Sequence, residues 1–467
     1  MLHPVCTSDE VRELDRRTIH EVGVPSLALM ETAGRACTEA ILEHFPEVRR
    51  RGACIYAGRG NNGGDGWVIA RLLHRQGVPV RVVVQEGRSS PDCAVMRGAA
   101  EALGVSVGEP EGWLQVDALL GTGLQSDLRP PVTELLARFD PGQPIMAVDL
   151  PTGLCGNTGH VYGLCLPAAL TVTFGAARLG QLLRSDLVGH LVVADIGLVD
   201  GPVSACVPDG QAISELIGPW DSDVHKGQRG RLGVYAGSRG MEGAGVLTCL
   251  AALRAGCGLV TLHSDRVPRG LPVEVMHTTE TLHERYDAVA VGPGLGVDPE
   301  ALRLWRELAL PGVFDADGLN SLGPRPESSR HPRAITPHVG EAARLLGWKS
   351  QEVVERRLEA SRALEGIAPS LLKGPNTLVG ARSFNPTGGP MLATAGSGDV
   401  LTGIVGAFLA RGLASFEALQ AGAFVHGLAG ELAGDGCIAS DIAQAIPKAL
   451  GCLPERLDVL DWRPLCA

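Results

Sequence analysis

Residues 395–399, with the sequence Ala-Gly-Ser-Gly-Asp, combine a loop of small residues with one carboxylate, that of Asp399. The apolar run from Val400 to Ala410 follows at once, and its large side chains recur at helical spacing. The Gly-Ser-Gly part should therefore begin a helix, where free backbone N–H groups attract anions, phosphate above all. Asp399 beside such an anion would act as a base or hold a cation; the alternative is that it only caps the helix.

Two further candidates, His338 and Lys373, each follow a predicted strand of the same half of the chain, residues 334–336 and 370–372. Ligands bind beyond the carboxyl ends of parallel strands, so both side chains should lie at the sheet edge that holds Asp399. Taken singly, a histidine or lysine of this kind is usually structural or solvated. Together with a glycine-rich helix start, they indicate a nucleotide phosphate site with a base beside it.

The first half carries a second set of polar loops. Residues 61–65, Asn-Asn-Gly-Gly-Asp, follow one predicted strand, Asp117 precedes a Gly-Thr-Gly loop, and Asp149 precedes a turn that contains Thr152. One acid at a strand end is often a helix cap, whereas three at successive strand ends are more typical of a site. An all-oxygen set suits a hard cation or a polyhydroxyl ligand rather than zinc. No G-x-G-x-x-G fingerprint is present, so ordinary hydride transfer is not inferred.

These loops need an alternation of strands and helices to position them. A capping box at residues 7–10 predicts a helix to about residue 20, and a second helix is expected over 26–44. Such alternation gives an α/β fold with parallel sheets and right-handed crossovers. The pattern pauses between 200 and 227, so we expect two domains, residues 1–207 and 208–467. The predicted strands are 53–57, 80–85, 116–120, 145–148, 170–174, 191–194, 232–236, 258–263, 288–291, 312–314, 334–336 and 370–372.

Composition excludes several classes of protein. The 467-residue chain has a net charge of −11 and only 4% aromatic residues, which argues against nucleic-acid and anionic-membrane partners. Its 12 cysteines form no Cys-x-x-Cys pair, so a metal or redox framework has no support. Residues 1–17 carry four acids and no apolar segment, unlike a signal peptide, and no apolar run is long enough to span a membrane. We expect a soluble, cytoplasmic protein.

Several long motifs, in one order, resemble a known pair of families. The second half resembles the ADP- or ATP-dependent NAD(P)H-hydrate dehydratases of the ribokinase-like superfamily, and the first half resembles NAD(P)H-hydrate epimerase. Together they look like the fused bifunctional repair enzymes of bacteria, with a Rossmann-like N-terminal domain and a ribokinase-like C-terminal one. The matching segments are Asn61–Gly66, Asp117–Gly123, Asp149–Gly153, His225–Gly227, Gly237–Gly245, Gly292–Gly296, Asp315–Asp317, Thr336–His338, Lys373–Gly374 and Asn385–Gly403.

The resemblance implies that the substrates are NADHX and NADPHX, which are NADH and NADPH hydrated on the nicotinamide ring. The first domain would interconvert the R and S hydrates with K⁺ bound. The second would dehydrate the S hydrate with ADP or ATP and Mg²⁺, and would release phosphate, and AMP if ADP is used. The residues leave ADP versus ATP, NADHX versus NADPHX, and a monomer versus a homo-oligomer open.

The resemblance also implies residue roles. Asp399 would be the base of the dehydratase, and Asp149 or Asp65 would move the proton in the epimerase. The implied epimerase contacts are Asn61, Asn62, Gly63, Gly64, Asp65, Gly121, Thr122, Gly123, Leu124, Gln125, Ser126, Asp127 and Asp149, with Asn62, Asp117 and Thr152 as K⁺ ligands. The implied dehydratase contacts are Ala244, Gly294, His338 and Asp399 for the hydrate and Lys373, Gly374, Pro375, Asn376, Thr377 and Gly398 for the nucleotide.

Two departures from the family pattern lie in the first half. Thr152 stands where serine is usual, and its hydroxyl still coordinates a cation. Arg178 stands where lysine is usual, which keeps the charge but not the shape. Asp399, Gly398 and Lys373 are intact, so an active dehydratase is expected. Two alternatives stay open: a ribokinase-type small-molecule kinase with an accessory domain, and a nucleotide-binding protein without turnover.

Overall fold

A computed structural model describes residues 1–124, 126–219, 223–280 and 285–464. Contacts divide the chain into two compact units. The N-terminal unit contains Pro4–Ala205 together with the segment from Leu460 onward, and the C-terminal unit contains Met1–His3 and Cys206–Val459. Each end of the chain is thus grouped with the other half.

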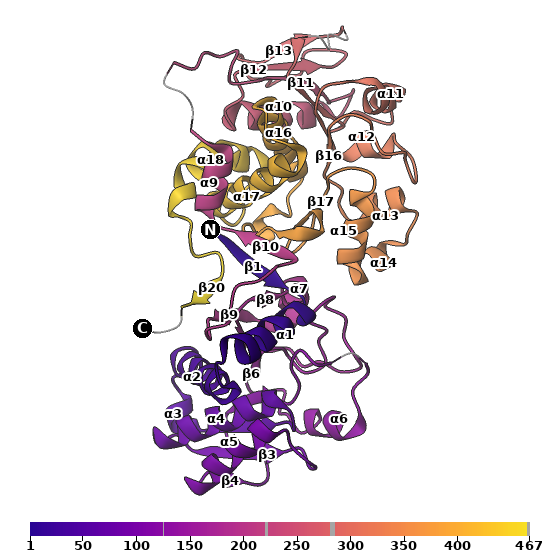
Figure 1. Ribbon diagram of the computed structural model, residues 1–467. Helices are drawn as coiled ribbons and strands as arrows, with labels where there is room; N and C mark the ends of the chain where they lie inside the picture. Colours follow the sequence, from indigo (N-terminus) through magenta and orange to yellow (C-terminus); the bar gives the residue numbers. More distant parts are fainter. Residues whose placement is uncertain (125, 220–222, 281–284, 465–467) are drawn as a thin grey trace. The chain divides into compact units, whose positions relative to one another are not determined.

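The N-terminal unit is built on a parallel sheet with the strand order β20-β9-β7-β6-β5-β2-β3-β4 (Figure 1). The central order β6-β5-β2 makes the three polar loops neighbours, because Ala57 pairs with Ala118 and Asp117 with Ala147. The strands are β2 (Ala53–Ala57), β3 (Val80–Val84), β4 (Ser106–Val107), β5 (Leu114–Ala118), β6 (Ile145–Val148), β7 (Leu170–Phe174), β9 (His190–Ala194) and β20 (Asp461–Arg463). In another sheet, β1 (Leu2–Cys6) pairs in parallel with β8 (Ala177–Arg178).

Helices cover both faces of this sheet. One buried cluster packs α2 and α4 onto β2, β5 and β6, and another packs Tyr56 and Phe139 on the opposite face. The predicted capping box forms at Thr7 and Glu10 and begins α1. The helices are α1 (Ser8–Arg17), α2 (Ser26–His44), α3 (Val48–Arg51), α4 (Asn61–Arg75), α5 (Pro91–Ala102), α6 (Pro130–Leu136), α7 (Leu179–Leu183) and α8 (Ser185–Val188).

The C-terminal unit has a second parallel sheet, in the order β13-β12-β11-β14-β15-β16. The loops after β11, β14, β15 and β16 therefore leave four adjacent strands at one edge. Its strands are β11 (Arg231–Tyr235), β12 (Leu259–His263), β13 (Met276–Thr278), β14 (Ala288–Val291), β15 (Gly312–Phe314) and β16 (Arg333–Ile335). Its helices are α9 (Gly210–Ile217), α10 (Glu242–Arg254), α11 (Pro299–Glu307), α12 (Ala316–Asn320), α13 (Val339–Leu346), α14 (Ser350–Glu355), α15 (Arg357–Glu365), α16 (Ser397–Ala410), α17 (Ser415–Ala433) and α18 (Ala439–Cys452).

The strand expected at 370–372 does not continue this parallel sheet. Residues 371–372 form β17 (Leu371–Leu372), which pairs antiparallel with β18 (Leu378–Val379), and only the bridge from Ser370 to Ile335 runs parallel. The chain reverses at once because Gly374 and Asn376 have φ values of 144° and 50°. β18 continues antiparallel to β19 (Ser383–Phe384), which pairs with β10 (Ala205–Pro208).

Helix α16 lies at the centre of the C-terminal unit and packs on α10 and α17 (Figure 1). A helix that is apolar all round is a buried one, and Ser397–Ala410 is buried except at Gly398 and Asp399. The two residues that reach solvent are therefore the ones singled out at the helix start. None of the helices in the described ranges is long and apolar enough to cross a bilayer.

Replacing Gly403 by alanine should destabilise the C-terminal unit by about 1–3 kcal/mol, because overpacking a tight core forces backbone shifts. A Cβ there would lie 2.3 Å from the Thr248 carbonyl oxygen, across the crossing of α10 and α16. Gly451→Ala is the control, since its Cβ on α18 would meet nothing within 4 Å. Thermal unfolding should show a lower midpoint for Gly403→Ala alone; equal midpoints would contradict the tight crossing.

Candidate active sites

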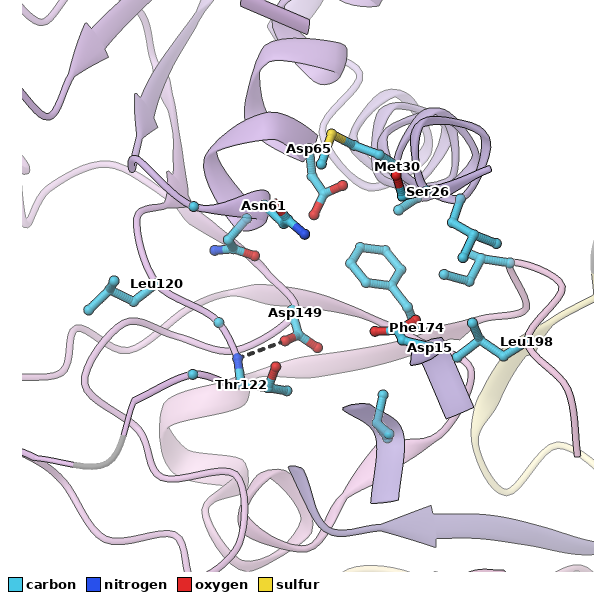
Figure 2. A pocket seen from close by; sticks show the side chains of 18 of the residues that line it. Asp15, Ser26, Met30, Asn61, Asp65, Leu120, Thr122, Asp149, Phe174 and Leu198 are labelled. Atoms are coloured by element: carbon cyan, nitrogen blue, oxygen red, sulfur yellow. Dashed lines mark hydrogen bonds between the residues drawn. The ribbon is translucent and has the colours of Figure 1, made fainter. Parts of the chain in front are cut away.

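A cavity of about 310 Å³ opens at the carboxyl edge of the N-terminal sheet (Figure 2). Its walls come from α1, α2 and α4 and from the loops after β5 and β6. Seven of the predicted epimerase contacts line it, beside Asp15, Phe174 and Arg178. The seven are Asn61, Asn62, Asp65, Gly121, Thr122, Gly123 and Asp149.

Asp149 is held firmly as an acceptor at the end of β6. Its carboxylate accepts hydrogen bonds from the Thr122 N–H at 3.1 Å and the Thr173 hydroxyl at 3.0 Å. The guanidinium of Arg178, 1% exposed, donates to it at 3.2 Å. The Asp149 backbone has a φ of 64°, an uncommon value for a residue with a side chain, and Gln181 donates to its carbonyl oxygen at 2.6 Å. These contacts fix the position of the Asp149 carboxyl group.

Asp65 lies in α4 and faces the same cavity. Burial, reinforced by the charges of Asp149 and Asp15, holds the pKa of Asp65 well above its ordinary value. Burial likewise raises the pKa of Asp15 to about 6, and Arg178 opposes that rise. The cavity therefore holds one hydrogen-bonded carboxylate and two acids that retain their protons more readily, a division that suits acid–base chemistry.

The predicted cation ligands gather behind this cavity. Thr152 donates from its backbone N–H and its hydroxyl to Asp117, both at 2.7 Å, and its hydroxyl accepts from the Leu120 N–H at 3.1 Å. Asn62 lies close to Gly121, the residue that follows Leu120 in the same loop, since a Cβ on Gly121 would stand 3.2 Å from the Asn62 Oδ1. Burial raises the pKa of Asp117, which Thr152 counteracts. Among the described residues, no basic side chain pairs with Asp117 and the buried Asn62 Nδ2 has no partner.

Some predicted epimerase residues lie elsewhere. Gly63 and Gly64 do not line the cavity; a Cβ on them would clash with the Gly58 carbonyl and the Met30 sulfur at 2.0 and 2.5 Å, so they allow α4 to pack closely. Leu124, Ser126 and Asp127 line a neighbouring cavity of about 500 Å³ instead. Gln125 lies outside the described residues.

In the C-terminal unit, a cavity of about 620 Å³ contains all six predicted nucleotide contacts. They come from the reversal after β17 and from the start of α16. Other walls come from residues 385–394 and from His426 on α17. The six residues are Lys373, Gly374, Pro375, Asn376, Thr377 and Gly398.

The start of α16 has the expected geometry for an anion site. Gly396 precedes the helix with a φ of 86°, and no side chain caps the first turn. A Cβ on Gly398 would lie 3.4 Å from the Lys373 Nζ, so the ammonium group stands over the helix N-terminus. Ser397 contacts the buried His426 ring at 3.0 Å, and burial lowers the pKa of that histidine to about 4. Free N–H groups and one ammonium group therefore face a common point.

Acidic side chains surround Lys373. Its Nζ lies 2.7 Å from Asp315 Oδ1 and 3.9 Å from Glu341 Oε2. Burial raises the pKa of Asp399 to about 6, the charges of Asp315 and Asp317 reinforce this, and Lys373 opposes it. Burial also raises the pKa of Glu341 to about 7. Asp399 is thus a carboxyl group that takes up a proton near neutral pH, as a general base requires.

The predicted hydrate contacts lie around this charged cluster and are not among the residues that line the 620 Å³ cavity. His338 is 3.3 Å from Glu341, and its pKa is lowered by burial and by Lys373. Gly294 and Ala244 are neighbours, since a Cβ on Gly294 would stand 3.0 Å from the Ala244 Cβ. His338 and Asp399 therefore both lie near Lys373, and Ala244, at the start of α10, lies next to Gly294.

Sequence reasoning missed several residues at these sites. Asp15 could not be identified as a site residue because it lies in an amphipathic helix with the pattern of a surface helix. Asp315 appeared only inside a motif, although it directly follows β15 and could have been chosen by that position, and Glu341 was not singled out. His426 lies in an apolar helix and touches the site only through tertiary packing.

Two family models match separate parts of the chain. The model described as NAD(P)H-hydrate dehydratase matches residues 232–450, and the one described as YjeF-related protein N-terminus matches 26–180. The bifunctional NAD(P)H-hydrate repair enzyme of Moorella thermoacetica is 36% identical, across 97% of this chain and 98% of its own length. The chain belongs to the bifunctional NAD(P)H-hydrate repair enzymes. The Escherichia coli member of this enzyme family is 35% identical, across 98% of this chain and 95% of its own.

A solved structure also resembles one half of this repair enzyme. The ADP/ATP-dependent NAD(P)H-hydrate dehydratase of Bacillus subtilis, co-crystallised with ATP and Mg²⁺, is 27% identical over 52% of this chain and 97% of its own, with a TM-score of 0.48. The predictions of a bifunctional repair enzyme and of an α/β fold with parallel sheets in both halves are confirmed.

Proposed function

We propose that residues 1–207 epimerise the R and S hydrates of NADH and NADPH, and that residues 208–467 dehydrate the S hydrate at the expense of ADP or ATP. The observation that carries the proposal is the presence of two separate cavities, one in each unit. One is lined by Asp65 and Asp149, and the other is lined by Lys373 and by Gly398, the residue before Asp399. A kinase with an accessory domain would not need the first cavity.

In the dehydratase, Asp399 takes the proton of the ring hydroxyl, whose oxygen then attacks the terminal phosphoryl group of the nucleotide. The N–H groups at the start of α16 and the Lys373 ammonium group stabilise the charge on the phosphoryl oxygens. Mg²⁺ enters with the nucleotide and supplies further positive charge. Phosphate then leaves with the C–O electron pair, helped by the ring nitrogen, and loss of a neighbouring ring proton restores the reduced nicotinamide.

In the epimerase, Asp65 gives its proton to the ring hydroxyl, which leaves as water while the ring nitrogen donates its electron pair. Asp149, held by Arg178 and two hydrogen bonds, stabilises the cationic ring. Water then adds to either face of the ring and returns a proton to the Asp65 carboxylate. Asp65 is proposed as the proton donor because burial raises the pKa of its carboxyl group well above its ordinary value.

Asn62, Asp117 and Thr152 fit an alkali cation, and we propose that they bind K⁺. The side-chain atoms that these three residues offer to a cation are all oxygens. The buried Asp117 carboxylate has no basic partner within the described ranges. Bound K⁺ would supply a positive charge that holds the loops after β2, β5 and β6 together. The thermal midpoint should be higher in KCl than in tetramethylammonium chloride, and Thr152→Val should remove that difference. Equal midpoints for the unchanged chain in both salts would rule this site out.

One assay tests the function as a whole. Chemically hydrated NADH is mixed with the full chain, Mg²⁺ and either ADP or ATP, and the near-UV absorbance of the reduced ring is followed. We expect recovery of absorbance and consumption of both epimers. Consumption of only the S hydrate would show that the first unit is inactive. A stable phosphorylated product would indicate a kinase, and no change with either nucleotide would overturn the proposal.

A further inference from the structure

The two cavities of the N-terminal unit share a wall. Gly60, Leu120, Gly121 and Gly123 line both the 310 Å³ cavity with the acids and the 500 Å³ cavity beside it. A nicotinamide hydrate dinucleotide consists of two nucleotides joined by a pyrophosphate. The acid cavity lies at the lower end of the range for small-molecule sites, roughly 300–1,000 Å³, so it suits one nucleotide and leaves the other to be placed.

The second cavity has the charge that a pyrophosphate needs. Arg59 and Arg129 line it, both are exposed, and no ion pair of the described residues engages either one. Nearby arginines differ, because Arg81 pairs with Glu111 and Arg138 with Glu109. A guanidinium group matches phosphate oxygens in both charge and geometry.

The boundary between the cavities carries a helix N-terminus as well. Helix α4, 15 residues long, begins at Asn61, and Gly60 precedes it without any side-chain cap. Its positive end therefore faces the wall that both cavities share, next to Arg59. Ser126 and Asp127, which also line the second cavity, offer oxygens that suit the hydroxyl groups of a ribose rather than a phosphate.

We propose that the second cavity binds the adenylate half of the hydrated dinucleotide, with Arg59 and Arg129 holding its phosphates. The dinucleotide then crosses the rim at Gly60 and Gly121, which places its pyrophosphate at the start of α4 and its hydrated ring beside Asp65 and Asp149. This inference rests on the proposed epimerase function. Arg59 and Arg129 act through substrate binding, and the acids perform the chemistry.

The test compares two substrates in the full chain without added ADP, so that the dehydratase is idle. Arg59→Ala and Arg129→Ala should each raise the KM for epimerisation of NADHX about tenfold with little change in kcat. With hydrated reduced nicotinamide mononucleotide, which lacks the adenylate half, both variants should match the unchanged chain. Arg59→Lys should recover part of the affinity, and Arg88→Ala, an exposed arginine nearby that does not line the cavity, should change nothing. An unchanged KM for NADHX, or an equal rise with the mononucleotide, would overturn the inference.

A binding measurement separates this inference from the proposed activity. ADP-ribose is titrated calorimetrically into the chain while a non-hydrolysable ATP analogue fills the nucleotide site of the C-terminal unit. The chain and Arg88→Ala should bind ADP-ribose alike, and Arg59→Ala about tenfold more weakly. Weaker binding by Arg59→Ala in a chain without epimerase activity would support the cavity and refute the reaction. Equal binding by all variants would refute the cavity even if epimerisation is confirmed.

Discussion

Asp399→Asn is expected to slow nucleotide-dependent dehydration of the S hydrate by about a hundredfold or more, since the amide cannot accept the hydroxyl proton. The fold should survive, because Lys373 keeps its 2.7 Å contact with Asp315 and the substitution removes a charge from a largely buried position. The measurement is the steady-state rate of NADH recovery with saturating nucleotide. Epimerisation in the other unit should continue at the unchanged rate.

Asp435→Asn is the matched control, because this aspartate is exposed and does not line the cavity. The pH profile gives a second check on the assignment. A base works only when ionised, so kcat/KM should fall as the pH drops through about 6, the pKa of Asp399, rather than near the ordinary aspartate value of 3.8. Full activity of Asp399→Asn would remove Asp399 from the mechanism.

Asp65→Asn is expected to lower the rate of epimerisation by about a hundredfold or more, because asparagine has no proton to give to the leaving hydroxyl. Dehydration of the S hydrate should be unaffected, so only the S hydrate of a mixture should be repaired and the R hydrate should remain. Chromatographic separation of the two epimers over time measures both outcomes. The burial that keeps Asp65 protonated also makes asparagine a mild substitution.

Asp149→Asn provides the comparison within the same cavity. It leaves the buried Arg178 without its anionic partner, so it should lower both the activity and the thermal midpoint, whereas Asp65→Asn should lower activity alone. Asp200→Asn is the inert control, on an exposed part of the unit. If Asp65→Asn kept its activity while Asp149→Asn lost it without any change in stability, Asp149 would be the proton carrier.

Much of the fold was predictable because the signals were local. The capping box at Thr7 and the apolar run after Asp399 each specify their own helix, and both helices form as predicted. The adjacency of the loops after β2, β5 and β6 follows from parallel winding, which brings successive strand ends to one edge. The gathering of Lys373 near Gly398 was expected for the same reason, although β17 reaches that edge from an antiparallel hairpin.

The remainder depends on tertiary contacts that leave no periodic pattern. Asp15 faces the acid cavity only because α1 packs against the end of the sheet. In the sequence, Arg178 is only a departure from the family pattern. Its role in the site depends on a buried contact with Asp149, which is 29 positions away in the chain. The strands at the two ends of the chain, β1 and β20, were not predicted from the sequence.

Strand β20 has a consequence for the order of synthesis. It forms an edge of the N-terminal sheet, where Asp461 contacts His190 at 2.9 Å across a separation of 271 positions. Until that segment has been translated, β9 presents unpaired backbone groups at an open edge, which is a template for wrong pairing. The first unit therefore completes its sheet only after the second has been made. A chain that ends at residue 207 would lack β20, so β9 would remain an unpaired edge strand.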